Sequence, residues 1–301
     1  MTLVFLVLVA TAVAAMVSAV CWRMASAASS TVGSARDAGA AIRRRRGRGA
    51  ALAARLDPEA ATGLALTIAL VVIVGGGVLL ATLTYLVRAD TDLVRLDTSV
   101  ANWGHRHASP FSTDALNAIT DLGEPVVVAV LAAVLAVVET ARTRSRWVIP
   151  FLLVVVAGNG ILTTTIKHLA DRVRPAVNPI AETLGPSFPS GHSSWSAAFL
   201  AAAALLLGRG RGRGARAVIA GVAAGLALTV AGSRVLLGVH WLSDVIAGLA
   251  LGSAWFAICA VAFGGRLLRF GAAASEASRV AEGRGTGAAR PPAAPSGTPA
   301  A

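Results

Sequence analysis

The sequence is poor in charged residues, cysteine and aromatic residues, and each shortage excludes a class of protein. Charged side chains make up 14% of the 301 residues, well below the roughly 25% of a soluble domain. The two cysteines, Cys21 and Cys259, both lie in apolar runs, which argues against a disulfide framework and a thiolate metal site. Aromatic residues account for only 5%, too few for the stacking surface of a protein that binds single-stranded nucleic acid. The Gly-rich nucleotide loop G-x4-G-K-[ST] is also absent from the sequence.

Apolar residues fill the sequence instead. They make up 55% of it, and the mean hydropathy is +0.70, so we expect an integral membrane protein. The net charge of +12 does not indicate a nucleic-acid partner, because the arginines stand in short blocks between apolar runs, as topology signals do. Such blocks also favour anionic lipid headgroups. We therefore expect membrane lipids, and no nucleic acid, as partners.

Seven apolar runs predict an all-α, polytopic transmembrane helical bundle. The first covers residues 1–22, and the others cover 63–87, 125–138, 147–166, 193–207, 217–232 and 242–264. Crossing ~30 Å of hydrocarbon takes ~20 helical residues, so the shorter runs cross only if polar residues at their ends also enter the bilayer. Residues 1–22 are compatible with a cleaved signal peptide or with a retained helix. A signal peptide begins with a positively charged stretch before its apolar core, but this run begins without Lys or Arg and is longer than a signal core. We therefore expect an N-terminal transmembrane helix.

The remaining segments are polar. Residues 23–62 are rich in Ala, Gly, Ser and Arg and include the block Arg43–Arg48, which predicts a disordered, basic cytoplasmic linker. Residues 88–123 predict one or two short helices that lie at the membrane interface. Residues 265–301 predict a disordered cytoplasmic tail.

Three polar clusters interrupt the apolar runs in the second half of the chain. They are the segment K-H-L-A-D-R-V-R-P at 167–175, the tetrapeptide P-S-G-H at 189–192, and the pattern S-R-x5-H-x3-D at 233–244. Each cluster alone has an ordinary explanation, as a basic loop, a helix cap or a solvated helical pair. Together, next to apolar segments, they indicate a functional site, because charged groups near membrane depth are costly and tend to be functional.

The clusters contain the groups that bind a phosphate. Lys167, the only lysine in the chain, joins Arg174 and Arg234 as a cation, and arginine can bind phosphate oxygens bidentately. Lys167 and Arg174 are seven residues apart, so on a helix they would share one face. Ser190 and Gly191 precede an apolar run, and at the N-terminus of a helix their backbone N–H groups would bind an anion.

Two histidines and one carboxylate could supply the chemistry. His192 and His240 are suited to proton transfer or to covalent catalysis. Asp244 follows His240 by four residues, one helical turn, so it is placed to hydrogen-bond the ring and fix its tautomer. The other polar side chains of the first cluster, Arg172 among them, are expected to shape the entrance to the site.

In these motifs the chain resembles the type 2 phosphatidic acid phosphatases, the membrane branch of the superfamily that also contains bacterial acid phosphatases and vanadium haloperoxidases. The family pattern is Lys-x6-Arg-Pro, then Pro-Ser-Gly-His, then Ser-Arg-x5-His-x3-Asp, and all three parts occur here without a substitution. The resemblance covers residues 63–264 and implies a six-helix core, to which residues 1–22 would add one more helix.

The resemblance implies hydrolysis of a phosphomonoester or pyrophosphate at a lipid headgroup. It implies that His240 attacks phosphorus, that Asp244 orients His240, and that His192 protonates the leaving oxygen and then activates water. The implied phosphate-binding residues are Lys167, Arg174, Ser190, Gly191 and Arg234. It implies no metal ion and no cofactor, since three cationic side chains supply the charge that Mg²⁺ supplies elsewhere. Phosphatidic acid, phosphatidylglycerol phosphate and a polyprenyl phosphate or pyrophosphate all stay open as substrates, and so does the oligomeric state.

The arginine distribution predicts which end of the bundle faces the cytoplasm. If every run from residue 63 onward spans once, the arginine-rich loops and the block Arg43–Arg48 fall on one side, which the positive-inside rule makes cytoplasmic. The three motifs fall on the other side, so we expect an extracytoplasmic site in the cytoplasmic (plasma) membrane. Two alternatives stay open. One is a non-catalytic protein that binds or translocates phospholipids. The other is a vanadate-dependent haloperoxidase, although the membrane spans argue against that branch.

Overall fold

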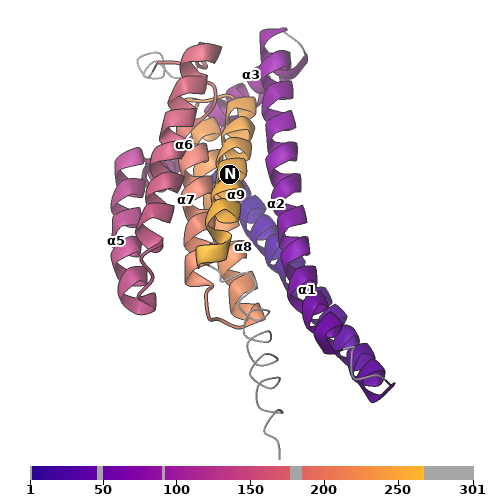
Figure 1. Cartoon of the computed structure of the whole chain (residues 1–301). Helices are drawn as coiled ribbons and strands as arrows, with labels where there is room; N and C mark the ends of the chain where they lie inside the picture. The colour runs from indigo at the N-terminus through magenta and orange to yellow at the C-terminus, as the bar shows by residue number, and fades with distance from the viewer. Residues whose placement is uncertain (1, 46–49, 90–91, 177–184, 268–301) are drawn as a thin grey trace, which may run out of the picture.

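The computed structural model describes residues 2–45, 50–89, 92–176 and 185–267, and these parts of the chain contain helices and no strand. The elements are α1 (Thr2–Arg45), α2 (Ala50–Arg88), α3 (Asp92–Arg106), α4 (Pro110–Thr120), the 3-10 helix η1 (Asp121–Gly123), α5 (Pro125–Thr143), α6 (Val148–Ala170), α7 (Gly191–Leu207), α8 (Arg213–Leu236) and α9 (Leu242–Leu267). The long helices form a bundle with α7, α8 and α9 in its middle, α5 and α6 on one side, and α1 and α2 on the other (Figure 1). This architecture confirms the predicted all-α membrane bundle.

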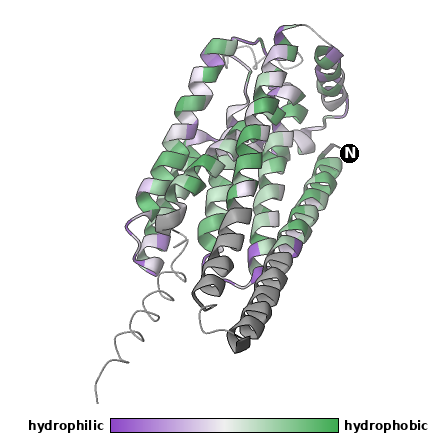
Figure 2. Ribbon diagram, turned by 45° about the vertical axis from the view of Figure 1, so that its right-hand side comes forward, coloured by the Kyte–Doolittle hydropathy of each residue, from purple (hydrophilic) through white to green (hydrophobic). Residues whose placement is uncertain are grey.

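Six of the described helices are long and apolar enough to cross a membrane. The candidate spans are Thr2–Met24, Leu66–Arg88, Pro125–Thr143, Val148–Ala170, Arg213–Leu236 and Leu242–Gly264. Figure 2 shows these helices as mostly hydrophobic along their length, with hydrophilic residues gathered near their ends. The shorter apolar helix α7 has 17 residues, which rise about 25 Å. Because α7 contacts α5, α6, α8 and α9, this short helix is enclosed by its longer neighbours.

Small residues bring α7 and α9 close together. Gly248 of α9 lies so near α7 that a Cβ atom there would be 2.4 Å from the carbonyl oxygen of Ser190. One turn further, a Cβ atom on Gly252 would be 2.3 Å from the carbonyl oxygen of Ser194. Glycine at both positions therefore permits the close helix packing that is common in membrane bundles. The two helices run in the same direction, so their N-termini lie side by side at one end of the bundle.

Helix α1 packs along α8 through a similar arrangement. A Cβ atom on Gly221 would be 2.3 Å from the carbonyl oxygen of Ala14, and one on Gly232 would be 2.3 Å from Cδ1 of Leu6. Later residues of α8 thus meet earlier residues of α1, so the two helices are antiparallel. The beginning of α1 consequently lies near the end of α8.

The structure differs from the sequence prediction in the segment 23–62. Its backbone is helical over most of its length, because α1 continues to Arg45 and α2 begins at Ala50. Alanine, the strongest helix former, is abundant in this segment and favours helix despite the glycine and serine residues around it. The role of 23–62 as a basic cytoplasmic linker stays a prediction. Of the predicted tail at 265–301, residues 268–301 lie outside the described residues.

The segment 88–123 forms two short helices, α3 and α4, as predicted, followed by η1. Helix α4 begins with a capping box, in which the backbone N–H of Ser112 donates to Oγ of Ser109 at 3.2 Å and the backbone N–H of Ser109 donates to Oγ of Ser112 at 2.8 Å. Both helices contact α8, and α3 also contacts α9. The two short helices therefore carry side chains to the end of the bundle where α7 and α9 begin.

Candidate active site

The three sequence motifs meet at one end of the bundle, where α6 and α8 end and α7 and α9 begin. The backbone N–H of His240 donates to the carbonyl oxygen of Arg234 at 3.2 Å, and that of Ser190 donates to the carbonyl oxygen of Asp244 at 2.9 Å. The side chain of Arg174 reaches Nε2 of His240 at 3.1 Å. Residues up to 70 positions apart in the sequence thus form one site.

Lys167, Gly191 and His192 complete this site. A Cβ atom on Gly191 would lie 4.0 Å from Cε of Lys167, and Nζ of Lys167 donates to the carbonyl oxygen of Pro186 at 2.6 Å. His192, the next residue of α7, lies within electrostatic range of all three cations and of the other histidine. The N-terminus of α7, a natural anion site, therefore faces the cations, and all eight predicted site residues are brought together.

Lys167 and Arg174 do not share a helix face, so that prediction was wrong. Helix α6 ends at Ala170, and Asp171 adopts the left-handed conformation (φ 44°, ψ 42°), from which its backbone N–H bonds to the carbonyl oxygen of Lys167. Aspartate tolerates this conformation, and Pro175 disfavours helical geometry in Arg174 before it. The two side chains converge by another route. Nη2 of Arg174 donates to the carbonyl oxygen of Pro186 at 3.3 Å, the same atom that Lys167 contacts.

The environment of His240 fixes which ring nitrogen is unprotonated. The guanidinium of Arg174 only donates hydrogen bonds, so Nε2 of His240, 3.1 Å from Nη1 of Arg174, must accept. The neutral ring then carries its proton on Nδ1. Burial lowers the pKa of His240 to about 4; the Asp244 carboxylate opposes this shift, and the charges of Arg174 and Arg234 add to it. His240 is therefore neutral at physiological pH, and its unprotonated Nε2 accepts a hydrogen bond from Arg174.

Asp244 lies on the Nδ1 side of His240, but the two residues are not one turn of a single helix. Helix α9 begins at Leu242, so His240 precedes it. Oδ2 of Asp244 is 3.5 Å from Nδ1 of His240, longer than a good hydrogen bond, and accepts the backbone N–H of Trp241 at 3.0 Å. Asp244 therefore holds the turn before α9 while its carboxylate faces the protonated nitrogen of the ring.

Arg172 holds this carboxylate in place, and the expectation that it shapes the entrance was wrong. Its Nη1 is 2.6 Å from Oδ1 of Asp244, and its Nη2 is 2.9 Å from Oδ2 of Asp97 in α3. Both carboxylates are fully buried, and the Arg172 side chain is 10% exposed. Ser243 joins the network, because its hydroxyl accepts from Nη1 of Arg172 at 2.7 Å and its backbone N–H donates to Oδ1 of Asp97 at 2.9 Å. Helix α3 is thereby linked to Asp244.

Two further polar residues, on either side of η1, reach into the site. Oε2 of Glu124 is 3.0 Å from Nε2 of His192, and Oγ1 of Thr120 accepts from Nη1 of Arg234 at 3.1 Å. A Cβ atom on Gly123 would lie 3.0 Å from the carbonyl oxygen of His192, so glycine lets η1 approach α7 this closely. The segment 120–124 thus contacts one histidine and one arginine of the motifs.

The sequence analysis missed Asp97, Thr120 and Glu124. All three lie before the motifs, in the segment 88–123 or directly after it, where several acidic residues are equally plausible partners. Glu124 alone carried a local signal, because it precedes Pro125 at the start of an apolar run and so falls at a helix N-terminus on the motif side of the membrane.

Comparison with known proteins places the chain in a family. Residues 148–267 match the family model of the PAP2 superfamily, and this range contains all eight predicted site residues. A crystal structure of a transmembrane PAP2 type phosphatidylglycerolphosphate phosphatase from Bacillus subtilis superposes with a TM-score of 0.59 at 26% identity, covering 66% of this chain and 99% of that one.

Curated relatives agree with this match. The chain is 36% identical over 135 residues to a lipid A 1-phosphatase of Rhizobium johnstonii, which is 40% of this chain and 51% of that protein. It therefore spans about half the length of that relative. It is 35% identical over 157 residues to the decaprenylphosphoryl-5-phosphoribose phosphatase of Mycobacterium tuberculosis (49% of this chain, 78% of that one). It is 31% identical over 153 residues to phosphatidylglycerophosphatase B of Bacillus subtilis (48% and 71%). All three relatives carry the name of a phosphatase, as the predicted class of phosphoric ester hydrolase requires, and the chain belongs to the PAP2 superfamily.

Proposed function

We propose that the protein is a membrane phosphatase that hydrolyses a phosphomonoester or pyrophosphate at a lipid headgroup, through a phosphohistidine formed on His240. The observation that carries this proposal is the pair of contacts to the His240 ring. Arg174 contacts Nε2 at 3.1 Å and Asp244 faces Nδ1 at 3.5 Å. An unprotonated nitrogen next to a phosphate-binding cation is the arrangement that attack on phosphorus needs.

In the first step Nε2 of His240 attacks phosphorus, a P–N bond forms, and the P–O bond to the leaving group breaks. His192 gives a proton to the leaving oxygen. Burial, with the charge of Arg234 next, lowers the pKa of His192 to about 3 without substrate, so this mechanism requires the ring to be protonated when the negatively charged phosphate binds beside it. Oε2 of Glu124, 3.0 Å from Nε2 of His192, is placed to accept a hydrogen bond from that protonated ring. In the second step His192 takes a proton from water, the hydroxide attacks phosphorus, and the P–N bond breaks. Inorganic phosphate leaves and His240 is again neutral.

Lys167, Arg174 and Arg234 bind the non-bridging phosphate oxygens, together with the N-terminus of α7 at Ser190 and Gly191. Negative charge builds up on these oxygens in the transition state, so fixed cations and N–H groups stabilise it more than they stabilise the substrate. Without substrate, a guanidinium hydrogen of Arg174 bonds to the nitrogen that attacks. A bound phosphate takes over this donor, so binding of the substrate itself releases the nucleophile.

Three classes of lipid fit this chemistry as the physiological substrate. Phosphatidic acid, phosphatidylglycerol phosphate and polyprenyl phosphates or pyrophosphates each place a phosphate at the membrane surface. The names of two relatives, phosphatidylglycerophosphatase B and decaprenylphosphoryl-5-phosphoribose phosphatase, support the second and third of these classes, whereas lipid A 1-phosphatase names a lipid outside the three. A panel of these lipids, assayed for phosphate release with purified protein in detergent, identifies the preferred class.

The same panel tests the catalytic assignment. His240→Ala is expected to abolish phosphate release, because the nucleophile is lost. His192→Ala is expected to retain slow turnover of substrates whose leaving group needs no proton. His105→Ala is the matched control, because His105 is exposed on α3 and contributes nothing to the proposed chemistry. Release at the wild-type rate by His240→Ala would refute the mechanism, and a wild type that binds these lipids without releasing phosphate would favour a non-catalytic binding protein.

We place the site on the extracytoplasmic side of the cytoplasmic membrane. The loops α5–α6 and α7–α8 lie at the opposite end of the bundle from the motifs. These loops and the helix ends beside them carry Arg142, Arg144, Arg146, Arg209, Arg211, Arg213 and Arg216, which supports this orientation. Cysteine labelling in cells tests it, in a background without the two native cysteines. A cysteine at Val173, 78% exposed beside the site, is expected to react with an impermeant thiol reagent, and one at Gly212, in the α7–α8 loop, is not. The reverse pattern would overturn the orientation.

A further inference from the structure

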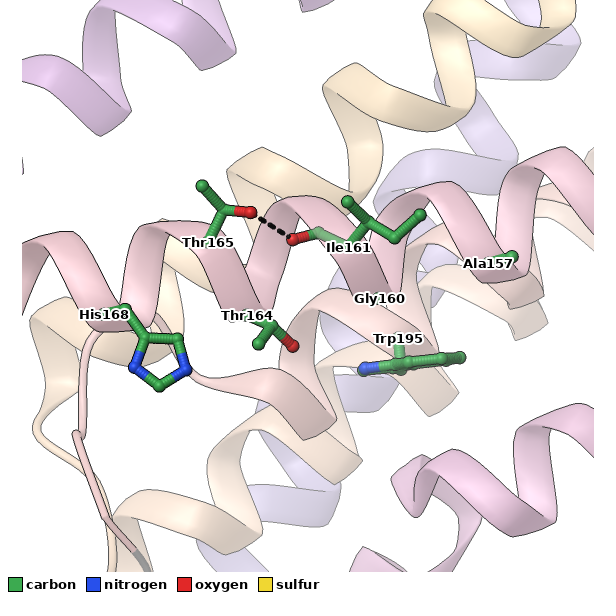
Figure 3. Close-up of a pocket in the computed structure, with 7 residues that line it drawn as sticks. All are labelled: Ala157, Gly160, Ile161, Thr164, Thr165, His168 and Trp195. Atoms are coloured by element: carbon green, nitrogen blue, oxygen red, sulfur yellow. Dashed lines mark hydrogen bonds between the residues drawn. The ribbon is translucent and has the colours of Figure 1, made fainter.

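A groove of about 480 Å³ runs along the outward face of α6, next to Trp195 of α7. We call it the α6 groove, and its lining residues are Ala157, Gly160, Ile161, Thr164, Thr165, His168 and Trp195. The α6 residues recur at intervals of three and four, so they share one helix face. Figure 3 shows the rings of Trp195 and His168 on the same side of α6, with Thr164 between them. From Gly160 to His168 the helix rises about 12 Å.

The wall of the groove depends on one glycine. A Cβ atom on Gly160 would lie 2.7 Å from Cζ2 and 3.0 Å from Cη2 of Trp195. Both distances are shorter than side-chain carbon atoms tolerate, so only glycine lets the indole ring lie against α6. The ring and this glycine together form one end of the groove.

The α6 groove and the phosphate site lie on either side of the Trp195 ring. A Cβ atom on Gly191 would be 4.0 Å from Cδ1 of Trp195, 4.0 Å from Cε of Lys167 and 3.9 Å from Cγ2 of Thr163. Trp195 follows Gly191 by one turn of α7, and Lys167 precedes His168 on α6. One edge of the indole ring therefore borders the proposed phosphate cradle, and its other edge borders the groove.

The surface of the groove suits a hydrocarbon chain. Helix α6 is a candidate membrane span, and Ile161, 68% exposed, presents its side chain outward. The hydroxyl of Thr165 donates to the carbonyl oxygen of Ile161 at 2.8 Å, as Figure 3 shows, so its hydrogen is already bonded within the helix. His168 lies at the end of α6 where the phosphate site is. The groove thus extends along a membrane helix from the end near the phosphate site, lined by the apolar Ala157, Gly160, Ile161 and Trp195 and by the polar Thr164, Thr165 and His168.

We propose that the α6 groove binds the part of the substrate's hydrocarbon chain nearest its headgroup, and that Trp195 determines which chains are accepted. This inference rests on the proposed function, because it takes a lipid phosphate as the substrate. A lipid whose phosphate occupies the cradle has its chain beside Gly191, and the indole ring is the apolar surface next to that point. Because a chain leaves lipid to enter the groove, the gain comes from shape and van der Waals contact rather than from leaving water. Trp195 therefore favours substrates whose chain fits against its ring.

The test compares kcat/KM for a long-chain phosphatidic acid in detergent micelles with kcat/KM for a soluble phosphomonoester that has no chain. Trp195→Ala removes the wall of the groove, and Thr164→Phe fills it from a lipid-facing position. Both are expected to lower the ratio of the two values by about tenfold, the lower end of what a hydrophobic pocket discriminates. Thr164→Phe, which does not border the cradle, is also expected to leave kcat/KM for the soluble substrate unchanged.

Two matched controls change other contacts of α6, one through Trp255 of α9 and one through Leu153 of α6 itself. Trp255→Ala also removes an indole ring packed on a glycine of α6, since a Cβ atom on Gly158 would be 2.3 Å from its Cζ2. Leu153→Phe enlarges an exposed side chain of α6 outside the groove. Both controls are expected to keep the wild-type ratio.

An unchanged ratio in Thr164→Phe and Trp195→Ala would overturn the α6 groove as a chain site, and so would an equal fall in the two controls. Thr164→Phe keeps the test decisive if Trp195→Ala does not fold. If the wild type released no phosphate from either substrate, the proposed function would fail as well, so the two failures are distinguishable.

Discussion

Replacing Arg172 with glutamine is expected to destabilise the protein and to slow catalysis, although Arg172 contacts no substrate in the proposed mechanism. Its guanidinium bridges Asp97 at 2.9 Å and Asp244 at 2.6 Å, and both carboxylates are fully buried. Glutamine leaves these two carboxylates without their shared cation. Removing one partner of a buried ion pair costs about 3–5 kcal/mol.

Such a loss is a large part of the ~5–15 kcal/mol that holds a typical protein folded, and it corresponds to a fall in Tm of roughly 10 °C. The effect on catalysis follows from the position of Asp244, which faces Nδ1 of His240. Loss of an outer partner of this kind typically reduces activity about 10–100-fold. We expect the reduction in kcat, with KM nearly unchanged, because Arg172 orients Asp244 and does not bind the phosphate.

The assay measures Tm and the kinetics of Arg172→Gln, Arg172→Lys and Asp97→Asn in one detergent. Arg172→Lys keeps the charge, but a single ammonium cannot bridge both carboxylates as the planar fork does, so partial rescue is expected. Arg95→Gln is the control, because Arg95 forms an ion pair of 3.0 Å with Asp92 at an exposed position where such pairs contribute little. Wild-type Tm and kcat in Arg172→Gln would show that the Arg172 bridge neither stabilises the fold nor orients Asp244.

Four further predictions concern the groups of the site. Burial lowers the pKa of His240 to about 4, so His240 should stay neutral and nucleophilic below pH 6, and the rate should drop only as the pH falls through about 4. A pH–rate profile in which the rate drops near the ordinary histidine pKa of 6.5 would contradict this. The same shift has a stability consequence. Between pH 6.5 and about 4 the unfolded chain binds a proton on His240 and the folded chain does not. The free energy of unfolding should therefore decrease as the pH is lowered from 6.5 to about 4, and thermal unfolding scans can measure this decrease. Activity should survive excess EDTA and be inhibited competitively by orthovanadate, which mimics the pentacoordinate transition state; full loss on chelation, restored by Mg²⁺, would show that the three cations are not sufficient. Lys167→Arg should lower activity although the net charge is unchanged, because a planar fork replaces a compact ammonium, and a wild-type rate would show that only the charge matters.

The residues of the site could be predicted from the sequence because their spacing is itself the signal. Lys167, Arg174, His192 and His240 stand in three short motifs, each next to an apolar run, and they converge in the structure. The local geometry between them could not be predicted in the same way. The turn at Asp171 ends α6 before Arg174, so the seven-residue spacing did not mean a shared helix face.

Ion pairs between residues far apart in the sequence could not be predicted from the sequence. Asp97 and Arg172 are 75 residues apart, and several acidic residues in the same segment could equally have been the partner. For the fold, the long spanning helices could be predicted, and the helical extension of α1 could not. Apolar runs predicted the spanning helices, since hydrophobicity over ~20 residues decides them, whereas the helical backbone beyond residue 23 in α1 depends on alanine propensity within a polar, glycine-containing segment.

The stereochemistry at phosphorus tests the proposed phosphohistidine most directly. A phosphorothioate monoester made chiral with oxygen isotopes can be hydrolysed in water enriched in a third isotope, and the configuration of the released thiophosphate can then be determined. Attack by His240 followed by attack by water inverts phosphorus twice, so the account predicts net retention. Net inversion would mean that water attacks the substrate directly and that no covalent bond to His240 is formed.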